Sequence, residues 1–423
     1  MRVSLLLIDL LFSYLIYNYV IREGLYLDPV QRFINYAKID TQADGESGTT
    51  PSSEKQKDLG RLLVKELKEL GLEDAYMDEW GIVYAHLKGE GDKIGLNAHQ
   101  DTALEVTDTN CNPQIIKNYD GKDFPLNEKY ILSSEEFPSL KQHIGKDLVV
   151  TDGNTLLGAD DKAGIAIIMS VLEYLHNHPE VKHHNISVSF TVDEEIGEGP
   201  LHFDLKKMDA DYAYTIDGGD ISSIDYENFN AAAAHVKVEG VSVHPGEGKN
   251  ALINALLLLN ELINSFPAKE TPYDAGYNDG YWHINSIEGT SDACEMDMIL
   301  RDFDYDNLLR RCDLVRNEAK RINAKYPKAK IEVEIKEQYY NMLPYVLKDP
   351  RPVEKAKAAL IKNGLTPKTT KIRGGTDGAT FSKMGLTTPN LGTGSSNHHG
   401  RFEYLVVQDF LKMIDVVLDI VKL

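Results

Sequence analysis

Three adjacent acidic residues, Asp193, Glu194 and Glu195, directly follow a run rich in β-branched and apolar residues. That run, 186–192, is predicted to be a β-strand, and a turn at Gly197 follows the acids. Polar side chains just past the carboxyl end of a strand lie where α/β sheets bind ligands. Two adjacent glutamates can divide the roles of metal ligand and general base. Taken alone, the segment is equally compatible with a solvated acidic turn.

Further side chains that bind metals or transfer protons follow other predicted strands or lie in polar turns. They are His99, Asp101, Asp160, Asp217 and His399. Two histidines with several carboxylates form an oxygen-rich set, which suits a pair of zinc or similar divalent ions better than one ion. Such a pair shares a carboxylate and a water, whose lowered pKa supplies hydroxide at neutral pH. The set therefore predicts a co-catalytic metal pair.

Each of these residues also has a purely structural interpretation. His99 is compatible with a histidine bonded to a main-chain carbonyl, Asp160 with a helix cap, and Asp217 with a turn before two glycines. The metal interpretation is favoured only when the residues are taken together, because the alternative needs several independent coincidences.

The elements that must position these residues alternate between strands and helices. Strands are predicted at 94–97, 148–151, 155–157, 186–192 and 212–216, a hairpin at 75–87, and helices at 28–37, 53–70, 165–176 and 406–421. This alternation predicts an α/β fold with a mostly parallel-stranded mixed sheet flanked by helices. Residues 104–145 show no clear period and are predicted to form a long irregular insertion, of the kind that often serves as a lid or binding loop.

The pattern changes between residues 229 and 341. Strands are predicted at 231–239, 282–288, 293–302 and 331–336, and helices at 251–266 and 306–324. This βαββαβ order is that of a ferredoxin-like α+β domain. We therefore expect an N-terminal segment 1–26, a catalytic domain in two parts, 27–228 and 342–423, and an inserted domain, 229–341.

Composition limits the class of protein. The chain has 423 residues, of which 42% are hydrophobic and 26% charged, values ordinary for a globular enzyme. Its formal net charge of -21 argues against a nucleic-acid partner. The three cysteines, Cys111, Cys294 and Cys312, form neither a disulfide framework nor a thiolate zinc site, which favours a reducing, cytoplasmic location.

The N-terminal segment leaves the location open. Residues 3–21 are largely apolar and follow Arg2, although Asp9 interrupts them and no small-residue cleavage site follows. The stretch is near the minimum of roughly 17 residues needed to span a bilayer. It is compatible with a non-native extension from an upstream start codon, an uncleaved membrane anchor or a signal peptide.

Several motifs together resemble the peptidase T family, tripeptide aminopeptidases of the di-zinc exopeptidase clan that also contains carboxypeptidase G and aminoacylases. The motifs lie at 98–102, 155–164, 193–197, 214–219, 243–246, 300–304, 373–378 and 399–400. The resemblance runs from about residue 29 to the C-terminal helix, more than nine-tenths of the chain.

The resemblance implies two zinc ions per subunit. It implies that His99, Asp160 and Asp217 bind one ion and that Asp160, Glu195 and His399 bind the other, with Asp160 as the bridge. Asp101, two residues after His99, would orient that histidine. Glu194 would be the general base, taking a proton from the bridging water and passing it to the departing amine. The neighbouring Asp161 and His398 are left out of the set.

Substrate-binding residues are also implied. His244 matches a histidine that stabilises the oxyanion from the inserted domain, and domain closure would be needed to bring it to the metals. Arg373 and, second, Arg301 are candidates for binding the peptide carboxylate, since an arginine fork fits a carboxylate. Asn254 matches a family position. The structural alternatives are a turn residue for His244, ion pairs for the arginines and a helix cap for Asn254.

The resemblance implies a zinc-dependent aminopeptidase that releases the N-terminal residue of tripeptides. The alternatives are another exopeptidase or amidohydrolase of the clan (a dipeptidase, a carboxypeptidase or an N-acyl amino acid deacylase) or an inactive binding protein. Expected partners are short peptides and, through an inserted lid or dimerisation domain, a second copy of the chain. A membrane would be a partner only if residues 3–21 form an anchor.

Overall fold

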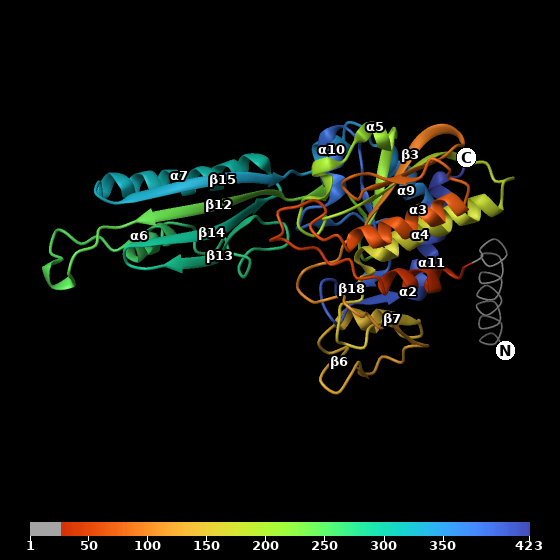
Figure 1. Cartoon of the computed structure of the whole chain (residues 1–423), viewed down its shortest axis with the longest axis horizontal. Coiled ribbons are helices and arrows are strands. Elements are labelled where there is room, and N and C mark those ends of the chain that lie inside the picture. The colour runs from red at the N-terminus through yellow and green to blue at the C-terminus, as the bar shows by residue number, and fades with distance from the viewer. Residues whose placement is uncertain (1–26) are drawn as a thin grey trace. The chain divides into compact units, whose positions relative to one another are not determined.

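A computed structural model describes residues 27–423 of the chain (Figure 1). The predicted N-terminal extension or anchor, 1–26, lies outside these residues. Within 27–423, none of the helices has the length and apolar character required to cross a membrane. The chain divides into two compact units. The first runs to Asp225 and also contains Tyr345–Thr369 and Met384–Leu423, and the second contains Tyr226–Pro344 and Thr370–Lys383.

A seven-stranded mixed sheet forms the centre of the first unit. Its strands, in spatial order, are β1 (Tyr76–Met77), β2 (Val83–Leu87), β8 (His184–Thr191), β3 (Glu90–His99), β9 (Tyr212–Ile216), β17 (Asn390–Leu391) and β10 (Ile224–Asp225). The four strands from β8 to β17 are parallel to one another, and the outer strands are antiparallel to their neighbours. The predicted α/β class and mixed sheet are therefore confirmed.

Helices cover this sheet. They are α2 (Pro29–Ala37), α3 (Gln56–Glu69), α4 (Ala159–Asn177), the short α5 (Leu205–Met208), α9 (Arg351–Lys362) and α11 (Val407–Val421). Helix α4 packs against β3 and β9, and α2 and α11 both pack on α4 (Figure 1). Its residues 163–172 are buried on every side, as expected for a helix that is apolar all round. Because α4 is held in the core, the polar residues at its start have a defined place.

A smaller four-stranded sheet adjoins the start of α4. It consists of β18 (Ser395–Ser396), β19 (Tyr404–Val406), β7 (Leu148–Val150) and β4 (Gln114–Ile116), and a hairpin of β5 (Phe124–Pro125) and β6 (Ile131–Leu132) lies nearby in sequence. These elements and the 3₁₀ helix Pro138–His143 share an apolar core that includes Leu132, Leu140 and Tyr404. The prediction of an irregular insertion at 104–145 is thus wrong in part, and residues 155–157 form no strand.

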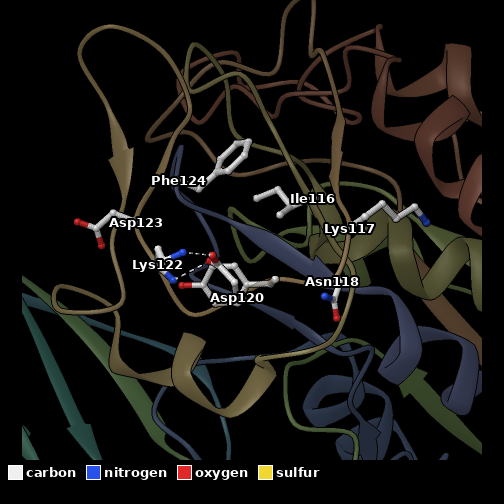
Figure 2. A pocket seen from close by; sticks show the side chains of 8 residues that line it. Ile116, Lys117, Asn118, Asp120, Lys122, Asp123 and Phe124 are labelled. Atoms are coloured by element: carbon white, nitrogen blue, oxygen red, sulfur yellow. Dashed lines mark hydrogen bonds and ion pairs between the residues drawn. The ribbon is translucent and has the colours of Figure 1, made fainter.

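A cavity beside strand β4 is lined by residues 116–124 other than Gly121 (Figure 2). Its volume is about 220 Å³. Its lining includes the ion pair Lys122–Asp120, with 2.7 Å between Nζ and Oδ2. The cavity contains none of the predicted site residues.

The second unit is built on one antiparallel sheet. In spatial order its strands are β13 (Tyr281–Gly289), β14 (Ala293–Asp302), β12 (Asn230–Glu239) and β15 (Lys330–Tyr339). Helices α6 (Ala255–Ile263) and α7 (Tyr305–Lys325) pack on each other and on β12 and β14, and α7 runs alongside β15 (Figure 1). Alternate apolar residues of β12 and β14 form the core beneath the helices. The element order and the antiparallel pairing confirm the ferredoxin-like prediction.

The boundaries differ from the prediction in two ways. The second unit spans 226–344 instead of 229–341, and it also contains residues 370–383, which we expected in the catalytic domain. The reason is local pairing, because β16 (Lys371–Ile372) lies parallel to β11 (Glu227–Asn228). An ion pair of 2.8 Å between Lys371 Nζ and Glu227 Oε1 accompanies this pairing. The chain then continues through α10 (Asp377–Met384), and the remaining short helix, α8, spans Leu343–Val346.

Candidate active site

Three of the predicted site segments lie at the carboxyl ends of adjacent parallel strands. His99 is the last residue of β3 and pairs in register with Thr191, the last residue of β8. Glu194 and Glu195 follow β8 after a short turn, and Asp217 directly follows β9. Because β8, β3 and β9 are neighbours in the sheet, these side chains meet at one edge, where α/β sheets bind ligands.

The start of helix α4 brings Asp160 to the same edge. Asp160 has a non-helical backbone, and the chain enters this position through Gly158, whose φ of 72° is left-handed. One turn later, Gly164 lets α4 approach the end of β9 closely. A Cβ atom at Gly164 would lie only 1.9 Å from the carbonyl oxygen of Ile216. This close packing sets Asp160 beside Asp217.

His399 enters from the turn between β18 and β19. It has a left-handed φ of 62°, a conformation that costs a non-glycine residue about 1 kcal/mol or more and is frequent at functional sites. Its Nε2 lies 3.0 Å from Glu195 Oε2 and 3.5 Å from Asp160 Oδ2. The small sheet therefore delivers the last predicted ligand to the edge of the large one.

Among residues 27–423, two groups of side chains have ligand atoms close enough to hold a metal ion. The first is His99, Asp160 and Asp217, and the second is Asp160, Glu195 and His399, with the ligand atoms of each group within 4.8 Å of one another. The two oxygens of Asp160 point to different groups, since Oδ1 lies 2.9 Å from His99 Nε2 and Oδ2 faces His399. The groupings coincide with the two predicted sets, and Asp160 belongs to both.

The two groups differ in their access to solvent. The side chain of His99 is 2% exposed, whereas that of His399 is 42% exposed. Of the two histidines, His99 is thus enclosed, and His399 opens toward the solvent.

The carboxylates give this site a strong preference for positive charge. Hydrogen bonds to Asp160 and Glu195 raise the pKa of the His399 imidazole to about 11. Burial would raise the pKa of Asp160, but hydrogen bonds from His399 and His99 outweigh it and hold that pKa well below its ordinary value. Burial, reinforced by the charge of Asp160, raises the pKa of Glu195 to about 7. The site therefore attracts cations.

The donor set fits a pair of metal ions. Within the described chain, Glu195 Oε1 is buried and has no hydrogen-bond partner, which is costly unless a cation or another donor faces it. The available donors are imidazole nitrogens and carboxylate oxygens, the ligands that zinc takes in co-catalytic sites. The three cysteines are free and buried and belong to neither group. The residues present are therefore consistent with two ions sharing Asp160.

Asp101 connects two of the ligand-bearing segments. It is fully buried, and its Oδ1 lies 3.4 Å from His99 Nδ1. The same carboxylate accepts the main-chain N–H groups of Glu194, at 3.1 Å, and Glu195, at 3.0 Å. Asp101 is thus placed to orient the His99 ring, whose Nδ1 also lies 3.1 Å from the main-chain carbonyl oxygen of Asp101. It also holds the acidic turn after β8, which the sequence did not reveal.

Two buried carboxylates near the ligands were missed. Asp161, which we left out, accepts the main-chain N–H of His99, at 3.2 Å, and that of Gly164, at 3.2 Å. Glu403, which no motif singled out, accepts main-chain N–H groups of the loop before α4. For Glu403 the signal in the sequence was an acidic residue between two aromatic residues, which is weak, whereas Asp161 lies within the motif at 155–164. His398, also left out of the predicted set, forms a hydrogen bond between its Nε2 and Ser395 Oγ, at 2.8 Å. It belongs to neither ligand group of the described chain.

The four predicted substrate-binding residues all belong to the second unit. His244 is exposed, and its Nδ1 accepts the N–H of Gly246 at 3.2 Å. Arg301 is buried and donates to the carbonyls of Ala232 and Leu300, and Arg373 donates to the carbonyls of Gly276 and Tyr277 and lies over three aromatic rings.

Asn254 is the N-cap of helix α6. Its Oδ1 accepts the N–H groups of Leu256 and Leu257, at 2.9 and 3.3 Å. We expect Asn254→Ala to lower the free energy of unfolding by about 1 kcal/mol, and Asn254→Asp, which keeps the acceptor, to change it little. Urea unfolding of the three proteins measures this. A rise in KM for peptides in a fully stable Asn254→Asp protein would instead assign the amide a role in substrate binding.

Known proteins resemble this chain over most of its length. A sequence profile described as Peptidase family M20/M25/M40 matches residues 150–423. A protein named peptidase T from Caldanaerobacter subterraneus is 46% identical over 401 residues, which cover 93% of this chain and 98% of the relative. Another protein named peptidase T, from Halothermothrix orenii, is 47% identical over 400 residues, with the same coverage of 93% and 98%.

Solved structures share the fold. An aminopeptidase PepT from Bacillus cereus superposes with a TM-score of 0.72 at 21% identity, covering 93% of this chain and 97% of that one. A tripeptidase from Staphylococcus aureus superposes with a TM-score of 0.74 at 21% identity, covering 93% of this chain and 96% of that one. A Bacillus subtilis protein is described as a dinuclear metal binding peptidase from the M20 family. It superposes with a TM-score of 0.60 at 14% identity, covering 93% of this chain and 96% of that one. On the strength of the sequence matches, the chain belongs to peptidase family M20/M25/M40 and, within it, to the group of proteins named peptidase T.

Proposed function

We propose that this peptidase is a two-zinc aminopeptidase that releases the N-terminal residue of tripeptides. The observation that carries the proposal is the position of Asp160, whose two oxygens face two separate groups of potential ligands. A carboxylate shared between two ligand groups is what a co-catalytic metal pair requires. The names of the relatives, peptidase T, and the description of one structural neighbour as dinuclear support the same assignment.

In this proposal His99, Asp160 and Asp217 hold one zinc ion, and Asp160, Glu195 and His399 hold the other. When bound, the zinc pair polarises the scissile carbonyl and lowers the pKa of a water to near neutrality. Glu194 belongs to neither ligand group of the described chain, and its charge already acts on His99. It takes the proton of the attacking water and transfers it to the departing amine. Asp101 keeps the His99 ring and the Glu194–Glu195 backbone in place for this step.

Recognition of the rest of the peptide is assigned to the second unit. The exposed imidazole of His244 is the proposed donor to the oxyanion. Of the two arginines, we favour Arg373 for the peptide carboxylate, because it is only half-buried, while Arg301 is buried. A guanidinium binds a carboxylate through two parallel hydrogen bonds.

The proposal is tested with alanine di-, tri- and tetrapeptides whose ends are free, N-acetylated or C-amidated. We expect the highest kcat/KM for the tripeptide with both ends free. Blocking either end should lower kcat/KM by about 10- to 100-fold, because a hydrogen bond to a charged group contributes roughly 1.5–3 kcal/mol. Chelation should abolish activity, and addition of zinc should restore it.

Two outcomes would contradict the proposal. Activity that survives complete removal of divalent ions would exclude the metal pair. Faster cleavage of N-acyl amino acids or of dipeptides would move the chain to a deacylase or dipeptidase function within the same family, because those substrates share the metal chemistry but not the spacing between the two charged ends.

A further inference from the structure

Glu403 is a buried carboxylate next to the proposed metal centre, and the proposed function gives it no role. Only 1% of its surface is exposed. Its Oε2 accepts the main-chain N–H groups of Leu157, at 2.9 Å, and Gly158, at 2.7 Å. Its Oε1 accepts the main-chain N–H of Asp160, at 3.0 Å. Every one of these bonds is to the loop that leads into helix α4.

The loop is shaped around this carboxylate. The left-handed φ of 72° at Gly158 lets successive N–H groups turn toward one side, as in the backbone concavities that bind anions. A side chain at Gly158 would also crowd the loop, since its Cβ would lie 3.1 Å from Thr102 Cγ2. The anion in this concavity is supplied by the chain itself, from a segment more than two hundred residues away.

Glu403 also belongs to the segment that carries His399. Its own main-chain N–H donates to the carbonyl of Gly400, at 3.2 Å, and closes the turn directly after His399. The next residue, Tyr404, begins strand β19, which pairs with β18 and β7. One residue therefore ties the backbone of Asp160 to the turn that holds His399.

We propose that Glu403 is a positioning residue that fixes the Asp160 backbone relative to His399, so that the Asp160 carboxylate can serve both ligand groups. This inference rests on the proposed two-metal function. In the described chain, the Glu403 carboxylate accepts its hydrogen bonds from backbone N–H groups, that of the ligand Asp160 among them. Its effect is therefore on the geometry, and hence the affinity, of the metal site, independent of any proton transfer.

Glu403→Gln is the informative variant. The amide oxygen of glutamine can take the place of Oε2 and keep the bonds from Leu157 and Gly158. The amide NH₂ group then faces the N–H of Asp160, donor against donor, so only the Asp160 bond is lost. The matched control is Asp78→Asn. Asp78 is 4% exposed, and its Oδ1 accepts the N–H groups of Trp80 and Ile82, both at 3.1 Å, in the β1–β2 turn.

The experiment measures zinc binding to the metal-free full-length proteins by titration against a competing chelator, together with their thermal unfolding. We expect the metal-free Glu403→Gln and Asp78→Asn proteins to lose similar amounts of thermal stability. Only Glu403→Gln should bind zinc about 10- to 100-fold more weakly, the range found when a group that orients a metal ligand is removed. The increase in Tm on adding zinc should shrink in that variant alone.

Unchanged zinc affinity in a folded Glu403→Gln protein would overturn the inference. An equal loss of zinc affinity in Asp78→Asn would overturn it as well. Absence of zinc binding by the unmodified protein would instead contradict the proposed function. If Glu403→Gln does not fold, amide hydrogen exchange in the unmodified protein decides the question. Protection of the Leu157, Gly158 and Asp160 amides without metal supports the inference, and protection that appears only with zinc overturns it.

Discussion

Replacing Glu194 with glutamine is expected to leave both zinc ions bound and to lower kcat by about 10²- to 10⁴-fold, the usual contribution of a general base. Glutamine has the same shape and can still accept a hydrogen bond, but it cannot take a proton at neutral pH. The main-chain N–H of Glu194, which donates to Asp101, is unaffected by the change. Steady-state kinetics on a tripeptide and elemental analysis of the same sample measure the two effects.

The control for this variant is Asp78→Asn, which alters a buried carboxylate that belongs to neither ligand group of the described chain and should keep native kcat and metal content. Retained turnover in Glu194→Gln would remove the assignment of general base. Loss of metal together with turnover would show that Glu194 acts as a ligand, although it belongs to neither group of the described chain.

Replacing Asp160 with asparagine is expected to reduce the metal content from two ions per chain to one or none. An amide is neutral and offers a single oxygen. It therefore cannot supply one oxygen ligand to the group that contains His99 and another to the group that contains His399. Activity should fall by more than about 100-fold, the upper range for loss of a group that merely orients a ligand. Elemental analysis and the zinc-dependent change in Tm measure the loss of ions directly.

The two variants together separate binding from proton transfer. Glu194→Gln should be inactive with zinc bound, and Asp160→Asn should be inactive because zinc is lost. Two ions per chain in Asp160→Asn, at native affinity, would mean that the shared carboxylate is not needed and that the two ligand groups are filled independently.

The fold could be predicted where the sequence pattern is long. Strands β8 and β9 and the second half of β3 are rich in apolar or β-branched residues and lead into polar side chains. The alternation of β12 and β14 is visible residue by residue. Such periodicity depends only on which side chains face a core. For the same reason, the βαββαβ order of the second unit was evident before the structure.

Short elements escaped prediction. Strand β17 has two residues and yet lies within the large sheet, and β16, also of two residues, places 370–383 in the second unit. Two residues carry no periodicity, so whether they form a strand depends on the neighbours that tertiary folding supplies. The small sheet that carries His399 is built from strands of two or three residues. Strands β4, β5 and β6, within 104–145, are just as short, which is why that segment appeared irregular.

The sequence by itself determined which residue types were available at the strand ends, and with them the expected chemistry of His99, Asp160, Glu195, Asp217 and His399. Only the tertiary structure decided that Asp160 turns one oxygen to each group, and that Asp101, Asp161 and Glu403 hold the backbone amides of these segments. The physical reason is that such hydrogen bonds join residues up to 246 positions apart. Their partners are backbone N–H groups, which are the same at every non-proline residue and leave no trace in the sequence.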